Sequence, residues 1–158
     1  MLGWCCLAAP AQAAGPRVGQ KAPVFAAHNL YGKPVTLNQF RGKVILLNFW
    51  ATWCGPCRVE LPRFDAWQAR YSADGLQVLA ISMDDNRDQA RAMADRLHLH
   101  FPMLAGNSRL GAAYGGIFGL PVTYLIDRDG IVRKRVEGET NLDQLEVEVQ
   151  KLLHEPHR

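Results

Sequence analysis

The segment that most restricts the fold of this chain is a near-continuous apolar run, Lys43–Ala51, which leads directly to two cysteines, Cys54 and Cys57. A run of this kind is typical of a strand buried on both faces of a sheet. Beyond Cys57, apolar residues recur at three- and four-residue steps as far as Tyr71, which predicts a helix. The order strand, Cys-x-x-Cys, helix therefore places both sulfur atoms where a helix begins.

The rest of the chain alternates further strands and helices around this unit. We expect a hairpin at 25–30 and 35–36, strands at 76–82, 103–105, 122–126 and 131–136, and helices at 86–97, 108–114 and 141–153. Alternating strands and helices with a closing hairpin predict a mixed sheet covered by helices on both faces. The expected fold class is α/β, a three-layer α/β/α sandwich.

The chain of 158 residues is expected to contain a signal-like segment and one domain, residues 1–14 and 15–158. The first segment is apolar and ends in Ala11-Gln12-Ala13, which resembles the end of a secretory signal. It lacks the positive charge with which such signals start. The true start of the protein could therefore lie further upstream, and the segment could be cleaved off or kept as a membrane anchor. We expect a periplasmic or otherwise extracytoplasmic protein, soluble or anchored at its N-terminus.

The charge pattern argues against nucleic acid as a partner. The formal net charge is only +3, from 18 Lys and Arg against 15 Asp and Glu. Arg87, Arg91 and Arg96 alternate with Asp88 and Asp95, as on a solvated helix face.

The cysteine pattern indicates redox chemistry. Cys5 and Cys6 fall in the signal-like segment, which leaves Cys54 and Cys57 as the pair of the domain. Two cysteines so close in sequence cannot staple a domain of this size. A zinc site would need further ligands, and we expect no metal, because the histidines are scattered: His28, His98, His100, His154 and His157.

The spacing of the pair suits thiol–disulfide exchange. Residues three apart in a first helical turn are neighbours, so Cys54 and Cys57 can form a disulfide. Cys54 is predicted to cap the helix, where unpaired N–H groups favour the thiolate, and to act as the nucleophile. Cys57 is predicted to be the resolving thiol. Trp53, Gly55 and Pro56, which lie next to the two cysteines in the sequence, are the expected substrate contacts.

The residues Asn48-Phe-Trp-Ala-Thr-Trp-Cys-Gly-Pro-Cys57, then Glu60-Leu-Pro62 and the strand of Leu120–Asp127, resemble the TlpA/ResA-like branch of the thioredoxin superfamily. The resemblance covers about residues 20–153. It implies a thioredoxin-like sandwich with an N-terminal β-hairpin and a central helical insertion. It also implies a protein-disulfide oxidoreductase that needs no cofactor besides its cysteines.

The resemblance carries three further residues into the site. Pro121 matches the cis-proline of the family, and the adjacent Leu120 backbone would pair with an extended substrate. Glu60 matches a glutamate that lies one helical turn beyond Cys57, where a partly buried carboxylate would accept the proton of that thiol. Asn48 departs from thioredoxin itself, which has a buried aspartate there, and this favours Glu60 in that role.

The leading hypothesis is an enzyme that reduces disulfides in exported proteins, supplied with electrons by a membrane thiol conduit. The reduction of apocytochrome c during cytochrome c maturation is the task that the resemblance implies. A peroxiredoxin is an alternative; Thr52 is present, but the proline that such enzymes carry upstream of the cysteine is missing. A copper carrier or chaperone is another, and it would need three residues between the cysteines and a partner histidine.

Overall fold

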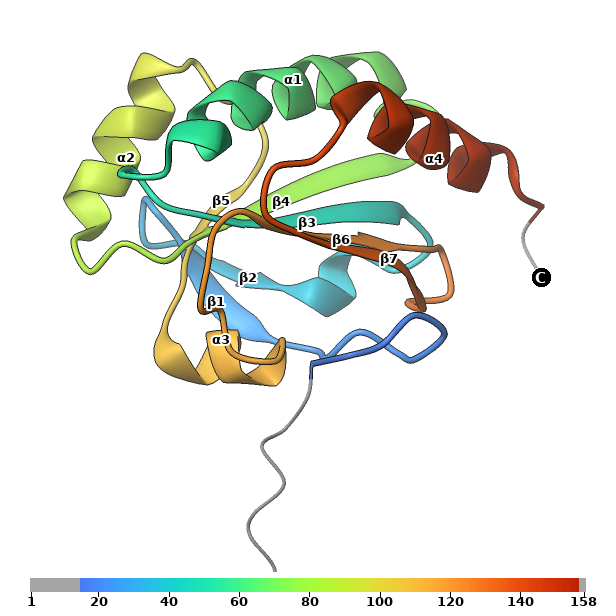
Figure 1. The fold of residues 1–158 in the computed structure, drawn as a ribbon, viewed down its shortest axis with the longest axis horizontal. Coiled ribbons are helices and arrows are strands. Elements are labelled where there is room, and N and C mark those ends of the chain that lie inside the picture. Colours follow the sequence, from blue (N-terminus) through green and yellow to red (C-terminus); the bar gives the residue numbers. More distant parts are fainter. Residues whose placement is uncertain (1–14, 157–158) are drawn as a thin grey trace, which may run out of the picture.

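The computed structural model describes residues 15–156. The signal-like segment, with Cys5 and Cys6, lies outside these residues, and so does His157. Within the described residues, one mixed sheet forms the middle of the molecule (Figure 1).

The sheet has the strand order β2-β1-β5-β4-β3-β6-β7. Its strands are β1 (Ala26–Asn29), β2 (Pro34–Thr36), β3 (Val44–Trp50), β4 (Leu76–Ser82), β5 (Met103–Ala105), β6 (Val122–Ile126) and β7 (Val132–Glu137). The central strand β3 runs parallel to β4 and antiparallel to β6. The carboxyl ends of β3 and β4 and the start of β6 therefore meet at one end of the sheet.

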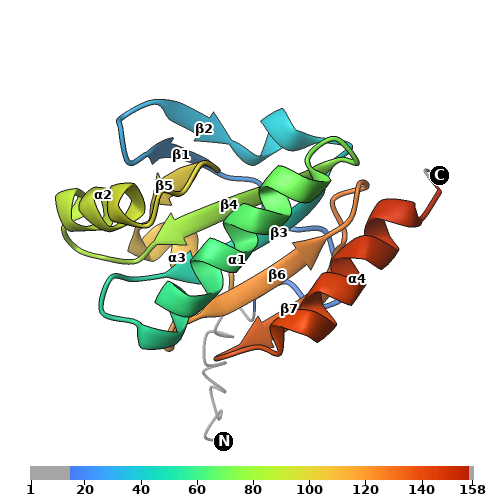
Figure 2. The ribbon, with the colours of Figure 1, turned by 90° about the horizontal axis from the view of Figure 1, so that it is seen from above.

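Helices cover both faces, which confirms the predicted three-layer sandwich. The helices are α1 (Gly55–Tyr71), α2 (Arg87–Arg96), α3 (Ser108–Ala113) and α4 (Leu142–His154), with a short 3-10 helix at Leu37–Phe40. Helices α1, α2 and α4 contribute to the apolar cluster on one face, and α3 contributes to the cluster on the other. Figure 2, seen from above, shows α1 and α4 on the same face of the sheet, with their axes running roughly along the strands.

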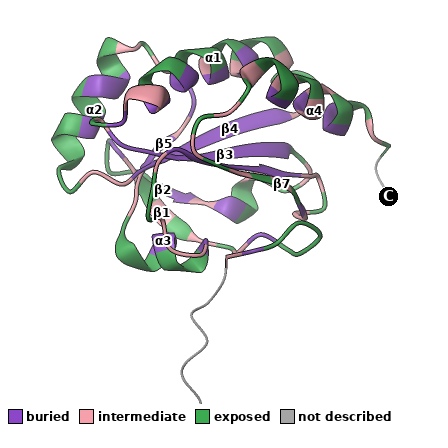
Figure 3. Cartoon of the chain, in the orientation of Figure 1, coloured by how far each residue is buried: buried purple, intermediate pink, exposed green. Residues whose placement is uncertain are grey.

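The apolar run that dominates the sequence becomes β3, in which all seven residues are buried. Its side chains alternate between two cores, because successive residues of a strand point to opposite faces. Leu46 and Trp50 pack with Phe64 of α1 on one side, whereas Leu47 and Phe49 belong to the cluster on the other. Figure 3 shows the buried sheet between helices whose outer sides are exposed.

Two features of the fold go beyond the sequence prediction. The N-terminal hairpin of β1 and β2 joins the sheet because β1 pairs antiparallel with β5, which follows it by about 75 residues in the chain. The 3-10 helix at Leu37–Phe40 was not expected. The other helices start where Asn86, Asn107 and Asn141 accept hydrogen bonds from the first turn, in agreement with the predicted boundaries.

No helix among residues 15–156 combines the length and the apolar character that crossing a membrane requires.

Candidate active site

The two cysteines lie at the junction between β3 and α1, as the sequence predicts. The Cys54 N–H donates to Ala51 O at 3.1 Å, which turns the chain from the end of the strand into the helix. Cys54 is the N-cap of α1, and its sulfur accepts a hydrogen bond from the Cys57 N–H at 3.3 Å. Pro56 occupies the first turn, where it gives up no helical hydrogen bond.

Cys54 and Cys57 form a disulfide with a Cα–Cα distance of 5.3 Å. Cys54 is 5% exposed and Cys57 is fully buried, so an attacking group from solvent reaches Cys54 first. After reduction, a thiolate at Cys54 would face the N–H groups of the first turn of α1, an arrangement that stabilises negative charge. The pair is thus built to alternate between the bonded and the reduced state.

Glu60 lies one turn further along α1 and is only 2% exposed. Its Oε1 accepts a hydrogen bond from the Thr140 N–H at 3.1 Å, whereas its buried Oε2 has no partner within residues 15–156. Burial raises the pKa of Glu60 to about 7; the Thr140 N–H lowers it and the nearby Glu139 raises it. This carboxyl can therefore change its protonation state near neutral pH.

The loop that precedes β6 lies beside the disulfide. The Leu120–Pro121 peptide bond is cis, the isomer that the family resemblance implies. Leu120 packs against the apolar cluster that contains Cys54 and Cys57. The Pro121 carbonyl accepts a hydrogen bond from the Gly138 N–H at 2.7 Å, so this loop is fixed to the segment that follows β7.

A carboxylate that the sequence analysis did not single out braces the loop before Cys54. Both oxygens of Asp84 accept the Thr52 N–H, at 3.0 and 3.1 Å, and Oδ1 also accepts the Thr52 hydroxyl at 2.6 Å. Ser82 donates to the same carboxylate at 2.8 Å. The sequence carries a signal for it, because Asp84 lies two residues beyond the end of β4, and the carboxyl ends of parallel neighbouring strands meet at one edge of the sheet.

The aromatic residues near the disulfide differ in their environment. Trp50 and Phe49 are fully buried and belong to the core. Trp53 is 70% exposed beside Cys54, in a position to contact a bound partner. Asn48 is buried and donates to Thr123 Oγ1 at 3.0 Å, and as a neutral amide it cannot accept a thiol proton.

The structure brings no metal-binding set together. Within the described residues there is no group of three or more His, Cys, Asp or Glu side chains arranged to hold a metal ion. His98 and His100 are exposed, and His100 Nδ1 lies 2.9 Å from Asp65 Oδ2.

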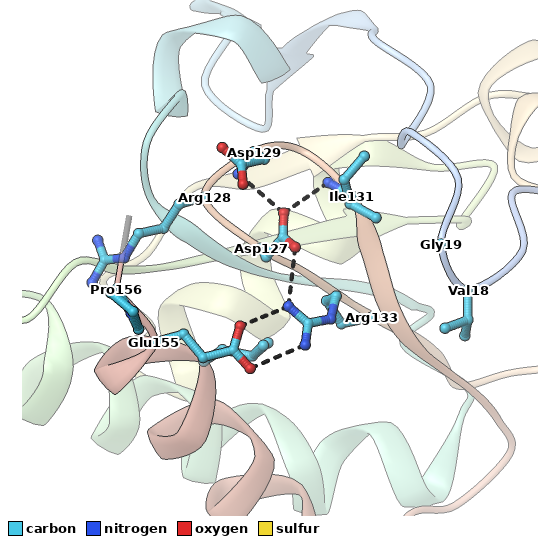
Figure 4. Close-up of a pocket in the computed structure, with 10 residues that line it drawn as sticks. Val18, Gly19, Asp127, Arg128, Asp129, Ile131, Arg133, Glu155 and Pro156 are labelled. Carbon is cyan, nitrogen blue, oxygen red and sulfur yellow. Dashed lines mark hydrogen bonds and ion pairs between the residues drawn. The ribbon is translucent and has the colours of Figure 1, made fainter. Parts of the chain in front are cut away.

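A pocket at the opposite end of the sheet is organised by ion pairs (Figure 4). Arg133 contacts Glu155 through two nitrogens, at 2.7 and 3.0 Å, and Asp127 through one, at 3.2 Å. Asp127 also accepts the N–H groups of Asp129 and Ile131. These contacts hold the β6–β7 turn against the end of α4, and no cysteine lines the pocket.

A helix that begins with a reactive cysteine pair, on a sheet flanked by a cis-proline loop, defines a thioredoxin-fold thiol–disulfide oxidoreductase. Comparison with known families then places the chain more closely. A model of the AhpC/TSA family matches residues 18–135, and the chain belongs to this family.

Individual relatives agree with this class. The chain is 33% identical over 135 residues to the thiol-disulfide oxidoreductase ResA of Bacillus thuringiensis subsp. konkukian, covering 85% of this chain and 78% of the relative. It is 38% identical over 141 residues to the thioredoxin-like protein YneN of Bacillus subtilis, covering 82% of each. A thiol:disulfide interchange protein of the thioredoxin family from Chlorobium tepidum superposes with a TM-score of 0.79 at 27% identity, covering 89% of this chain and 99% of that one. The predicted fold, enzyme class and ResA-like resemblance are confirmed.

Proposed function

We propose that this enzyme reduces disulfides in exported proteins outside the cytoplasm. The observation that carries the proposal is the Cys54–Cys57 pair, with Cys54 as the slightly exposed N-cap of α1 and Cys57 fully buried behind it. The buried Glu60 one turn along the helix supplies the proton chemistry.

In the first step of the proposed reaction, the Cys54 thiolate of the reduced enzyme attacks one sulfur of the substrate disulfide. A bond forms between Cys54 and that sulfur, the substrate disulfide breaks, and the other substrate sulfur leaves as a thiolate. The Leu120 backbone would align an extended substrate segment beside the site, with Trp53, Gly55 and Pro56 on the other side.

In the second step, Cys57 resolves the mixed disulfide. The Glu60 carboxylate accepts the Cys57 proton, and the Cys57 thiolate attacks the Cys54 sulfur and displaces the substrate as its second thiolate. Two electrons have then passed from the enzyme dithiol to the substrate. Because Glu60 has a pKa of about 7, its carboxylate form is available at neutral pH.

The direction of the reaction is tested by the reduction potential of the pair in a glutathione redox series. The Gly55-Pro56 dipeptide is shared with thioredoxin, so we expect a value of about −270 mV rather than the roughly −120 mV of the oxidant DsbA. The difference of about 150 mV corresponds to about 7 kcal/mol for two electrons. A value close to that of DsbA would overturn the reductant function and leave the fold unaffected.

The location and the partners belong to the same proposal. The signal-like residues 1–14 support export, and a reductant in an oxidising compartment needs a continuing supply of electrons, for which a membrane thiol conduit is suited. Apocytochrome c is proposed as a substrate because the resemblance of the Asn48–Cys57 and Glu60–Pro62 motifs to the TlpA/ResA-like branch implies it. Cell fractionation tests the location, and the rate of reduction of oxidised apocytochrome c, compared with that of insulin, tests the substrate; equal rates would argue for a general reductase.

A further inference from the structure

An open groove of about 660 Å³ lies on the face of the sheet that carries α3, at the end of the sheet where β3 and β4 end. Met83, Asp84 and Asp85, which follow β4, form one wall, and Ile117 and Phe118, from the loop before β6, form another. None of these residues takes part in the exchange steps described above.

The groove is connected to the redox site on two sides. Asp84 holds Thr52, which lies two residues before Cys54. Phe118 lies three residues before Pro121, a separation of at most about 11 Å even in extended chain. The groove therefore lies within reach of a polypeptide that presents a cysteine to Cys54.

Phe118 gives the groove an apolar contact surface. The side chain is 98% exposed, although its ring lies against Gly116, where an added side chain would collide with it. Ile117 and Met83 are partly buried and pack on the core beneath α3, so they extend this apolar surface inward. An aromatic ring left uncovered beside a reactive site favours contact with a partner.

The wall opposite carries negative charge. Asp85 is exposed and Asp84 is partly buried, and neither forms an ion pair with a basic side chain of residues 15–156. Asp84 is used in hydrogen bonds to Thr52 and Ser82, which leaves the Asp85 carboxylate free to face a cation. Lys or Arg on a bound segment would complement this wall.

We propose that the groove binds the stretch of substrate polypeptide next to the reactive cysteine. It selects an extended segment with a large apolar side chain, which packs on Phe118, and a Lys or Arg, which faces Asp85. This proposal rests on the proposed function and specifies the sequence around the disulfides that the enzyme prefers.

Peptides that each contain one cysteine, linked through a disulfide to thionitrobenzoate, test the proposal. Attack by Cys54 releases coloured thionitrobenzoate, so the rate is read directly with the reduced full chain. Four peptides combine Lys or Glu with Leu or Ser, placed on the N-terminal side of the cysteine in one set and on the C-terminal side in another. The rate with the symmetrical reagent DTNB serves as the reference for each enzyme variant.

In one of the two sets, the one in which the test residues lie on the side of the cysteine that faces the groove, we expect the Lys–Leu peptide to react about tenfold faster than the Glu–Ser peptide. Both rates are taken relative to DTNB. Phe118→Ser should remove the preference for Leu over Ser and keep that for Lys over Glu. Asp85→Lys should reverse the charge preference and keep that for Leu. The matched controls Val147→Ser and Asp129→Lys, an exposed apolar and an exposed acidic residue away from the groove, should retain both preferences.

Equal relative rates for all peptides, or the same losses in the two controls, would overturn the groove proposal. Binding of fluorescent peptides in which Ser replaces the cysteine separates this failure from failure of the proposed function. If exchange is absent but these peptides bind with the expected preferences, the redox function is wrong and the groove stands. If exchange is fast but shows no preference, the groove is wrong and the redox function stands.

Discussion

The two ends of the central sheet hold their acidic side chains in different ways. At the end where β6 turns into β7, Asp127 accepts two backbone N–H groups and contacts Arg133, which also binds Glu155. At the end where α1 begins, the buried Glu60 has a single hydrogen bond, from the Thr140 N–H, and its other oxygen has no partner within residues 15–156.

The difference shows how one fold divides its charged groups between stability and chemistry. A carboxylate with several donors and a cation serves to fix the chain. A buried carboxyl with few donors has a raised pKa, which makes proton uptake easy near pH 7 and makes the ionised form costly. We therefore expect substitutions at the redox end to change the rate of disulfide reduction, and substitutions at the opposite end to change only the free energy of unfolding.

Substitution of the cysteines should give the largest contrast between the two ends. We expect Cys54→Ala to reduce disulfide reduction by at least about a thousandfold, because the nucleophile is lost. Cys57→Ala should instead accumulate mixed disulfides with substrate, because the first step proceeds and the second cannot. Non-reducing electrophoresis with a disulfide substrate distinguishes the two variants; trapping by Cys54→Ala would mean that the roles are exchanged.

Glu60→Gln should change how stability depends on pH. The folded pKa of Glu60, about 7, lies above its ordinary value of 4.5, so this group stabilises the fold most below pH 4.5 and the stabilisation is lost as the pH rises through 7. From the shift we expect the oxidised parent to lose about 3 kcal/mol relative to the variant over this range. Urea unfolding of both proteins from pH 4 to pH 8 measures the difference.

The same substitution tests the redox role of Glu60. If its carboxylate accepts the Cys57 proton, the Gln variant should resolve mixed disulfides more slowly and lose the part of the pH–rate profile that is centred near pH 7. Glu148→Gln, which alters a carboxylate on the exposed surface of α4, is the matched control and should leave the profile unchanged. A profile unaltered by Glu60→Gln would assign the proton to another acceptor.

Asp84→Ala should affect both properties, because Asp84 fixes the loop before Cys54. It removes the acceptor of the Thr52 N–H, the Thr52 hydroxyl and the Ser82 hydroxyl, and we expect a loss of about 1–3 kcal/mol in the free energy of unfolding. The rate with DTNB should fall as the loop loosens. Asp85→Ala is the control for stability, and an equal loss there would show that the hydrogen bonds of Asp84 are not responsible.

Arg133→Met should give the smallest effect and only on stability. Its ion pairs with Glu155 and Asp127 are partly exposed to solvent, so we expect a loss of about 1 kcal/mol. The rate of disulfide reduction should be unchanged, since the substitution lies at the far end of the sheet. Thermal unfolding and the DTNB assay together check this, and a reduced rate would contradict the division between the two ends.

Much of this organisation follows from local sequence signals. The apolar run of β3, the three-residue spacing of Cys54 and Cys57 and the capping asparagines act within a few residues of one another, and the elements they define match the predictions. The position of Glu60 on the face of α1 also follows from helix periodicity.

The contacts that tune the site depend on residues far apart in the chain, and the sequence did not reveal them. Glu60 accepts its hydrogen bond from Thr140, eighty residues away, and Thr52 donates to Asp84, thirty-two residues away. The exposure of Phe118 depends on what the folded chain leaves uncovered around it. Such pairings require the tertiary arrangement of β4, β7 and α4, for which a single sequence has no periodic signal.

The short connection between β7 and α4 touches both halves of the redox site. Gly138 donates to the carbonyl of Pro121, and Thr140, two residues later, donates to Glu60. Among residues 15–156, the Thr140 N–H is the one hydrogen-bond donor to Glu60, so this connection joins the loop of the cis-proline to the buried carboxyl. One four-residue segment thus fixes the position of the backbone that would align a substrate and of the carboxyl that would accept the Cys57 proton, so a change in its length would disturb both at once.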